Sequence, residues 1–533
     1  MTGLHVEEYE VRAVPARHPS PFEPTTLLLG VLVALLGAVI GLELLTRVGI
    51  TPNSSIIGAI IAMAVARIPL SLFRAFASVP RQNLLQTVIS GATFGGANAL
   101  LLPMGVLWLV GEVELVPVMM LGALMGLVLD AAVLYRLFDS RIYPARELWP
   151  SGVATAECII AGDRGGQRAK LLGAGGLVGG VGQYLGIPMD VFGVCWIGNM
   201  WALTMFGVGL LVRGYAPAVA GVDLEELYIP HGIMIGAGSV ALFQIVAATR
   251  SRADDAASGP SLHAGARRVR GGLAFGFVGF AAAASVMAVL AGLYAEMSPP
   301  MLVAFVIFAA VAALGSELVV GISAMHAGWF PAFATALIFL VLGMLVGFPP
   351  LPLAFLVGFT ASTGPAFADM GYDLKAGWIL RGRGAHAVFE RQGRRQQFLA
   401  EMLGFGVAAV IVLLFHGYYF SNELFPPVDR VYAATIAAGT DPALAGSLLL
   451  WVLPGAVVQL LGGPARQLGI LFATGLLIYN PVAGWTALVS LAIRVVLIRK
   501  FGGAVQSPMY VLAGGFIAGS ALTSFGTATV RAR

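Results

Sequence analysis

The stretch ELWPSGVATAECIIAGD, residues 147–163, decides the fold of this chain. It is an apolar segment that contains Pro150 and Gly152 and carries a carboxylate, Glu157, near its middle. A bilayer core about 30 Å thick requires about 20 apolar residues, so residues 149–162 are too few to span it unaided. A short, broken and charged apolar segment predicts a discontinuous membrane helix of the kind that lines transporter binding sites.

A second, weaker copy of this stretch lies in the other half of the chain, as ELFPPVDRVYAATIAAG at residues 423–439. The spacing of Gly179, Gln183 and Pro188 also recurs 276 residues later as Gly455, Gln459 and Pro464. Matches in chain order at nearly one offset predict an internal duplication. Because Ala434 stands in place of Glu157, we expect different chemistry in the two halves.

The composition indicates a polytopic membrane protein. Of the 533 residues, 58% are hydrophobic and only 11% are charged, whereas soluble domains carry about 25% charged residues. The two cysteines lie in apolar segments and indicate packing, not a disulfide or a metal site. The net charge of +4 is modest and sits in loops, so we expect the lipid bilayer as a partner and no nucleic acid.

Hydrophobic runs recur along the whole chain and predict an all-α fold with about 16 transmembrane helices, in a range of about 14 to 18. The expected segments are 26–49, 54–74, 83–111, 115–138, 149–162, 168–188, 190–213, 229–250, 270–295, 299–325, 327–347, 350–370, 397–418, 430–440, 442–463, 465–480, 482–499 and 508–527. Glycines 91, 95 and 96 with Pro103 interrupt the third run, and Gly364-Pro365 interrupts the run at 350–370. Whether 149–162 and 430–440 cross the membrane or re-enter it stays open.

Polar and basic segments predict the organisation of the chain. We expect an N-terminal tail at 1–25, a transmembrane half at 26–250, a linker at 251–269 and a second half at 270–533 with a loop at 372–396. Lys and Arg crowd the linker and that loop, so the tail, the linker and the loop are predicted to be cytoplasmic, in a multi-pass protein of the inner (plasma) membrane. A homodimer is left open.

Polar residues inside apolar segments are the candidate functional groups, because their burial in a membrane is costly. Asn83, Gln86 and Thr87 share one helix face, and with Ser151, Thr155 and Glu157 they are the predicted substrate-binding residues. Glu157, Glu317, His326 and Asp369 are the predicted proton-coupling residues, since each can carry a proton. Further charges in or near membrane segments are Glu43, Asp130, His231, Glu401 and Asp429.

Other function classes find less support in the sequence. No P-loop, HExxH or CxxC pattern occurs, and no cofactor or bound metal is predicted. The charges in apolar segments are scattered, whereas a channel usually requires a continuous polar lining or rings of like charge, so a passive pore is the alternative to a transporter. Asp373, His386 and Glu390 could suggest a membrane enzyme, but six basic residues surround them, and we interpret 372–396 as a solvated face of a protein that is not an enzyme.

Two motifs resemble the oligopeptide transporter family, which includes the yellow-stripe-like metal-chelate transporters. Residues 149–156, WPSGVATA, are similar to its Tyr/Trp-Pro-Ser-Gly-Thr-Ala-Thr-Ala stretch, and residues 81–87, RQNLLQT, resemble its Gln-Glu-Asn-Thr-x-Ile-Gln-Thr stretch without the Glu. The resemblance covers residues 26–527 and is closest to a prokaryotic, yellow-stripe-like member. It implies about 16 helices and a secondary transporter, driven by a proton gradient, that imports small peptides or metal chelates.

Overall fold

The computed structural model describes residues 17–48, 54–69, 75–250, 266–439 and 442–531. These residues form helices and no strand, which confirms the all-α membrane fold. In the first half the helices are α1 Pro24–Val48, α2 Ser54–Ala66, α3 Val79–Phe94, η2 Gly95–Leu101, α4 Leu102–Leu109, η3 Val113–Leu115, α5 Val116–Leu137, α6 Pro150–Arg164, α7 Gly166–Tyr184, α8 Met189–Ile197, α9 Met200–Ala220 and α10 Ile229–Arg250.

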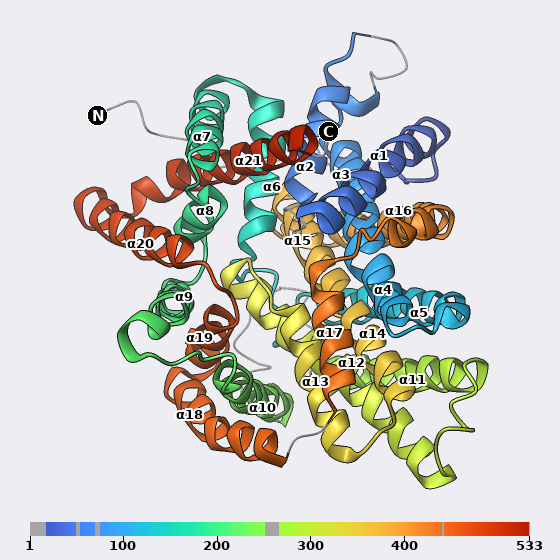
Figure 1. Ribbon diagram of the computed structural model, residues 1–533. Coiled ribbons are helices and arrows are strands. Elements are labelled where there is room, and N and C mark those ends of the chain that lie inside the picture. The colour runs from blue at the N-terminus through green and yellow to red at the C-terminus, as the bar shows by residue number, and fades with distance from the viewer. Residues whose placement is uncertain (1–16, 49–53, 70–74, 251–265, 440–441, 532–533) are drawn as a thin grey trace.

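The second half has a similar series of helices (Figure 1). They are α11 Ala266–Leu290, α12 Pro299–Ala327, α13 Ala332–Val346, α14 Pro350–Ser362, α15 Pro365–Leu380, α16 Ala387–Ser421, α17 Pro427–Ala438, α18 Pro442–Arg466, α19 Leu468–Leu476, α20 Pro481–Phe501, η4 Gly502–Val505 and α21 Gln506–Arg531. Most of the predicted linker, residues 251–265, and most of the predicted tail, residues 1–16, lie outside the described residues.

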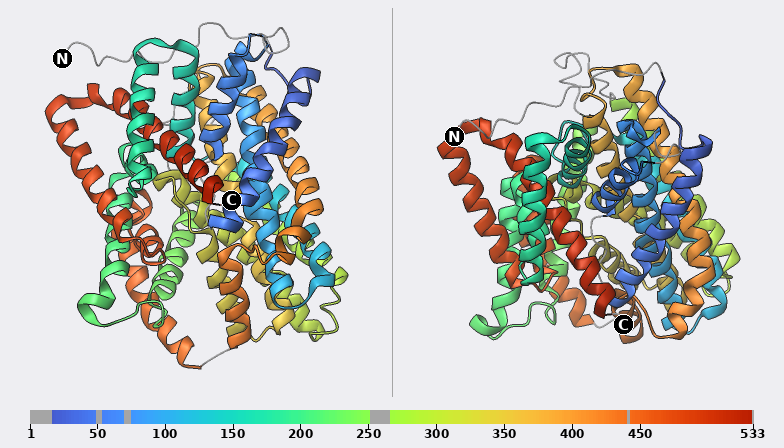
Figure 2. Two further views of the ribbon diagram at one scale, coloured as in Figure 1. Left: turned by 45° about the horizontal axis from the view of Figure 1, so that its top comes forward. Right: turned by 90° about the horizontal axis from the view of Figure 1, so that it is seen from above.

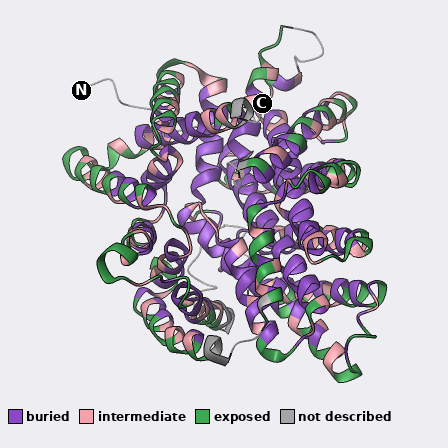
Figure 3. Ribbon diagram, viewed as in Figure 1, coloured by how far each residue is buried: buried purple, intermediate pink, exposed green. Residues whose placement is uncertain are grey.

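Ten helical segments among the described residues are individually long and apolar enough to cross a bilayer. This is fewer than the about 16 predicted, because several predicted spans are short helices and because the spans predicted at 482–499 and 508–527 form one continuous segment, Pro481–Thr527. Helix α6 has 15 residues and α17 has 12, which at 1.5 Å per residue is about 22 Å and 18 Å. Exposed residues, many of them large and apolar, follow the outward faces of the peripheral helices (Figure 3), as expected of surfaces that meet lipid.

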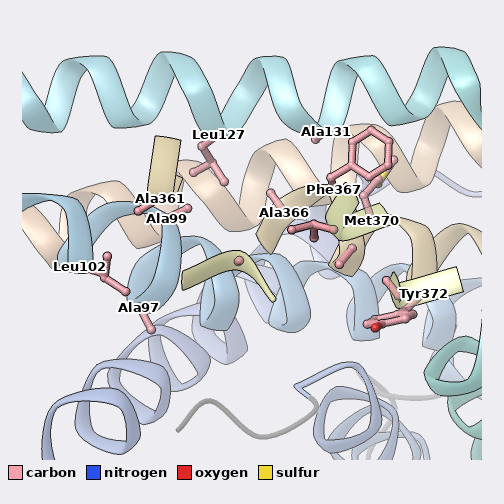
Figure 4. Close-up of a cluster of buried hydrophobic side chains, with 14 of the residues drawn as sticks. Ala97, Ala99, Leu102, Leu127, Ala131, Ala361, Ala366, Phe367, Met370 and Tyr372 are labelled. Carbon is pink, nitrogen blue, oxygen red and sulfur yellow. The ribbon is translucent and has the colours of Figure 1, made fainter. Parts of the chain in front are cut away.

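Both predicted interruptions are present as local changes of helix geometry. Residues Gly95–Leu101 form a π-helix between α3 and α4, and α14 ends before Gly364, whose φ of 104° strongly favours glycine. Small side chains of the two broken segments, among them Ala97, Ala99, Ala361 and Ala366, lie in one buried cluster (Figure 4). The broken helices therefore approach each other closely at the centre of the molecule.

The helices form two lobes that each draw on both halves of the sequence (Figures 1 and 2). We call α7–α10 with α18–α21 lobe 1, and α1–α6 with α11–α17 lobe 2. Helix α7 packs along α21 and α10 along α18, while α9 packs on α19 and α20 on α8. In lobe 2, α6 packs on α15 and α17 on α4. In each of these pairs a helix of one half of the sequence packs on a helix of the other half, so both halves contribute to both lobes.

The predicted loop at 372–396 is wrong in its extent. Helix α15 continues to Leu380 and α16 begins at Ala387, so only a short turn separates them. Asp373 and Glu390, expected on a solvated face, are completely buried. Burial of Glu390 is possible because two arginines pair with it: Arg381 Nε donates to Glu390 across the turn at 2.8 Å, and Arg394 Nε of α16 donates to the same carboxylate at 2.7 Å.

Candidate functional site

The stretch at 147–163 folds into the N-terminal end of α6, and its tryptophan fixes where that helix starts. Trp149 adopts a φ of 41° at the N-cap, and its backbone N–H donates to the Met325 carbonyl at 2.8 Å. Its buried ring packs against Gly371 of α15. Gly152 brings the backbone of α6 against α15, since a Cβ there would lie 2.5 Å from the Tyr372 carbonyl oxygen.

A cavity of about 360 Å³ lies where the two lobes meet, a volume typical of small-molecule sites. Ser151 at the start of α6 and Tyr372 of α15 lie in its wall. Lobe 1 contributes Gln183, Asp190, Ser520 and Ser524, whereas lobe 2 contributes aromatic side chains. The aromatic residues of the wall are Phe94, Trp329, Phe330, Phe333, Tyr372 and Tyr432.

About one helical turn from this cavity lies a cluster of three carboxyl groups, which we call the acid cluster. It consists of Asp369 and Asp373 of α15 and Glu401 of α16, all completely buried. One oxygen from each of them lies within 4.8 Å of the others, an arrangement that could also hold a cation. Pro365 and Phe94 of the cavity wall lie four residues from Asp369 and from Ser90, or about 6 Å along α15 and α3.

Hydroxyl and amide groups of α2 and α3 surround the acid cluster. Ser90 Oγ donates to Asp369 Oδ1 at 2.6 Å, and Ser55 Oγ donates to Asp373 Oδ1 at 2.9 Å. Gln86 Nε2 donates to the same oxygen of Asp373. Four of the six carboxyl oxygens, Asp369 Oδ2, Asp373 Oδ2 and both of Glu401, accept no hydrogen bond from a described donor.

The acid cluster has no basic partner in the described part of the chain, where no Lys or Arg forms an ion pair with any of its three members. Glu401 and Asp373 lie close enough for one carboxyl to donate a hydrogen bond to the other, which requires a proton on one of them. Buried carboxylates at this distance repel each other strongly. A proton or another cation bound here would relieve this repulsion.

The structure brings part of the predicted substrate-binding set to the acid cluster. Gln86 donates to Asp373, and Asn83 Nδ2 donates to Gln86 Oε1 at 3.1 Å. Thr87 accepts a hydrogen bond of 3.3 Å from Gln397, which also donates to the Asp373 carbonyl at 2.6 Å. None of these residues is among the described residues that line the cavity, so their contact with substrate stays a prediction.

The other predicted residues lie apart. Ser151 lines the cavity, while Thr155 Oγ1 donates to the Ser151 carbonyl at 2.9 Å within α6. Glu157 forms a buried ion pair with Arg168 at 2.6 Å. His326 is buried near the end of α12, and its Nδ1 has no hydrogen-bond partner among described groups.

Glu317 lies against a second carboxyl, Asp130 of α5, in the interior of lobe 2. Asp130 Oδ2 accepts hydrogen bonds from the backbone N–H groups of Gly364 at 2.9 Å and Phe367 at 2.7 Å. Asp130 therefore caps the start of α15 at its break from α14. The sequence pointed to Asp130 and Glu401 only as isolated charges and missed Asp190.

Comparison with known families gives the class of this architecture. The family model described as OPT oligopeptide transporter protein matches residues 24–243 and 191–530, which together cover almost the whole chain. The chain belongs to the oligopeptide transporter family. It is therefore a multi-pass membrane transporter of the OPT family, as the two sequence motifs indicated. No curated protein sequence matches the chain.

In this OPT transporter one of the two motifs that carry the resemblance lies at the cavity, and the other lies at the acid cluster. Residues 149–156 begin α6 and place Ser151 in the cavity wall. Residues 81–87 lie in α3 and supply Gln86 to the acid cluster. Between them runs α15, which contributes Tyr372 to the cavity and Asp369 and Asp373 to the cluster.

Proposed function

We propose that this protein is a proton-coupled secondary transporter that imports a small peptide-like or metal-chelating solute by alternating access. The observation that carries the proposal is the acid cluster of Asp369, Asp373 and Glu401, which is buried one helical turn from the cavity and has no basic partner among the described residues. In this proposal the cluster takes up the coupling proton, and the cavity holds the solute.

The charge of the acid cluster supports a proton as the coupling ion. A charged side chain inside a membrane protein is costly unless a partner compensates it. Here the side-chain donors to Asp369 and Asp373 from the described helices α2 and α3 are neutral groups, among them those of Ser55, Gln86 and Ser90. Uptake of protons removes the repulsion among the three groups, and the loss of a proton restores it.

The route from proton to solute is short. Helices α3 and α15 carry polar residues of the cluster at Ser90 and Asp369, and they carry cavity residues at Phe94 and Tyr372. A change of charge in the cluster that shifts α15 against α3 therefore also moves two walls of the cavity. Asp130 of α5 accepts from two backbone N–H groups at the start of the same helix, so a shift of α15 would also act on α5.

The two lobes support alternating access. The cavity lies at their junction, with Asp190 and Ser520 on lobe 1 and Trp329 and Tyr372 on lobe 2. A solute that contacts both walls ties its binding to the relative position of the lobes. Rocking of lobe 1 against lobe 2 would open the cavity to one side of the membrane and then to the other.

Reconstitution into proteoliposomes tests the proposal. An inward proton gradient should drive accumulation of a tripeptide or a metal chelate above its external concentration, together with acidification of the lumen recorded by a pH-sensitive dye. Glu401→Gln and Asp369→Asn should abolish solute-dependent acidification. The matched control is Asp163→Asn at the exposed end of α6, which makes the same chemical change outside the cluster and should leave coupling intact.

Three outcomes would reject parts of this proposal. Uptake that collapse of the proton gradient leaves unchanged would remove proton coupling, and uptake driven by a sodium gradient instead would assign the cluster to that cation. Flux that never exceeds equilibration, with single-channel currents, would indicate a passive pore.

A further inference from the structure

We infer that Asp190 is the anchor for a cationic nitrogen of the transported solute, and that the cavity therefore selects amines over solutes with net negative charge. This inference rests on the proposed function and specifies the chemical class of its substrate. Asp190 is the one side chain with a formal charge among the described residues that line the cavity, and no Lys, Arg, His or Glu accompanies it.

Asp190 is held in place by the fold around the start of α8. Pro188 is the N-cap of this nine-residue helix, so Asp190 lies in its first turn. There the positive end of the helix dipole favours the ionised carboxylate. The carboxylate of Asp190 forms no ion pair with any Lys, Arg or His among the described residues. Arg494 of α20, a helix that packs on α8, donates instead to the carbonyls of Cys195 and Gly198 at the other end of α8.

Acceptor groups extend the polar wall around Asp190. Gln183 Oε1 accepts hydrogen bonds from Ser520 Oγ at 2.8 Å and from the Met189 backbone N–H at 3.4 Å, which fixes the orientation of the amide. Ser524 lies in the same wall one turn along α21 from Ser520. Ser520 gives its hydrogen to Gln183, so the lone pairs of its Oγ stay free to accept. A carboxylate beside this hydroxyl oxygen matches an ammonium group, which has three N–H donors and no acceptor.

The opposite wall suits the rest of such a solute. It is formed mainly by apolar and aromatic side chains of lobe 2, including Phe94, Trp329, Phe330 and Tyr432. Aromatic faces bind apolar groups and attract cations through their electron-rich surface. A solute with an ammonium end and an apolar body would contact both lobes, with its cation on lobe 1 and its body on lobe 2.

The charge of the cavity lining disfavours an anionic metal chelate. The cavity has no basic side chain to compensate a net negative charge, and Asp190 would repel it. Helix α13 begins at the cavity with Ala332 and has no acidic residue in its first turn, so the positive end of its dipole could accommodate a single carboxylate. We therefore expect zwitterions and cations to bind and net anions to be excluded.

Equilibrium binding in the absence of any ion gradient tests this inference separately from transport. Purified full-length protein would be titrated with trileucine, N-acetyl-trileucine, trileucine amide and the iron(III)–citrate complex. Acetylation removes the ammonium group and should weaken binding at least tenfold, whereas amidation of the carboxyl end should change it less than threefold. Iron(III)–citrate should not bind at the concentrations that saturate the peptide.

Variants at Asp190 link the selectivity to this carboxylate. Asp190→Asn should weaken binding of trileucine at least tenfold and abolish the difference between free and acetylated peptide, a non-additivity that mere loss of fold would not give. Asp190→Glu should keep the preference for the free amine. Asp163→Asn should leave all affinities unchanged.

Three results would overturn the inference. They are equal binding of free and acetylated peptide to the native protein, a preference for the free amine that survives in Asp190→Asn, or binding of iron(III)–citrate when no amine binds. Because no gradient is present, loss of proton coupling in the liposome assay would leave these results unaffected, and the two hypotheses fail separately.

Discussion

Gly152→Ala is the substitution whose effect follows most directly from the structure. A Cβ at Gly152 would lie 2.5 Å from the Tyr372 carbonyl oxygen and 2.7 Å from Lys375 Cβ, whereas ordinary van der Waals contact begins near 3.4 Å. Helices α6 and α15 must therefore separate by close to 1 Å, at the point where both line the cavity. Overpacking of this kind costs about 1–3 kcal/mol.

The displacement would also disturb the anchor of the loop before α6. Lys375 Nζ donates to the carbonyls of Ala145 at 2.8 Å and Glu147 at 2.6 Å, and both bonds lengthen if α15 moves away. The matched control is Gly162→Ala on the same helix, where the added Cβ meets only the flexible side chain of Met63. Rotation of that side chain can make room, so the control should cost little.

The reactivity of a buried cysteine provides the assay. Cys158 lies on α6 and is completely buried, as is Cys195. In a Cys195→Ala background, a maleimide dye reports local opening of α6. A cost of about 1–3 kcal/mol raises the labelling rate of Cys158 by roughly 5- to 150-fold in Gly152→Ala. A rate within twofold of the parent protein, or an equal rise in Gly162→Ala, would refute the proposed packing.

Three further predictions concern buried charges. Asp130→Ala should destabilise the start of α15 by roughly 2–6 kcal/mol, because two buried N–H groups lose their acceptor, and Asp130→Asn should cost less in the same thermal-unfolding assay because it keeps a carbonyl oxygen. Glu157→Gln should retain proton-driven uptake, and loss of coupling in this variant would show that Glu157 belongs to the proton path. Arg168→Ala should lower the free energy of unfolding by about 3–5 kcal/mol, because it leaves the buried carboxylate of Glu157 unpaired. Burial, with the nearby charge of Arg381, lowers the pKa of His18 to about 4 from an ordinary value of 6.5. When residues 17–24 detach from the helices they pack on, His18 regains its ordinary pKa. Between these two pH values it then binds a proton that it does not bind when packed. The packing of residues 17–24 should therefore weaken as the pH falls through this window. Hydrogen exchange of that peptide, corrected for its intrinsic rate, should show the effect in the native protein and not in His18→Phe.

The helices and their breaks were predictable from the sequence because they depend on local composition. Apolar runs gave the helices, since the chain has too little polar material for any other arrangement. The glycines at 95 and 96 indicated the π-helix, and Gly364-Pro365 indicated the end of α14. The helical placement of the two family motifs was also predictable, because each motif lies along one continuous helix.

The acid cluster was not predictable, because it depends on contacts between distant helices. Asp373 lies in a stretch rich in Lys and Arg, which indicated a solvated loop by composition. The structure pairs those charges instead: Arg381 and Arg394 bind Glu390, and Lys375 binds backbone carbonyls. Charges counted along the chain do not reveal such pairing, so the composition of the stretch predicts a solvated loop where the structure has buried helix. Asp190 was missed for a similar reason, because it begins a segment directly after Pro188 and resembles an interfacial residue.

The separation of the two acidic sites bears on the direction of coupling. A transporter with one carboxylate for both ligands makes a proton and a cationic solute compete, which produces exchange. Here the acid cluster lies on α15 and α16 in lobe 2, while Asp190 lies on α8 in lobe 1. A proton and an amine can therefore occupy the protein together, and their like charges are kept apart by the turn of helix between cluster and cavity. Simultaneous occupancy is what symport requires, so we expect proton and amine to move in the same direction.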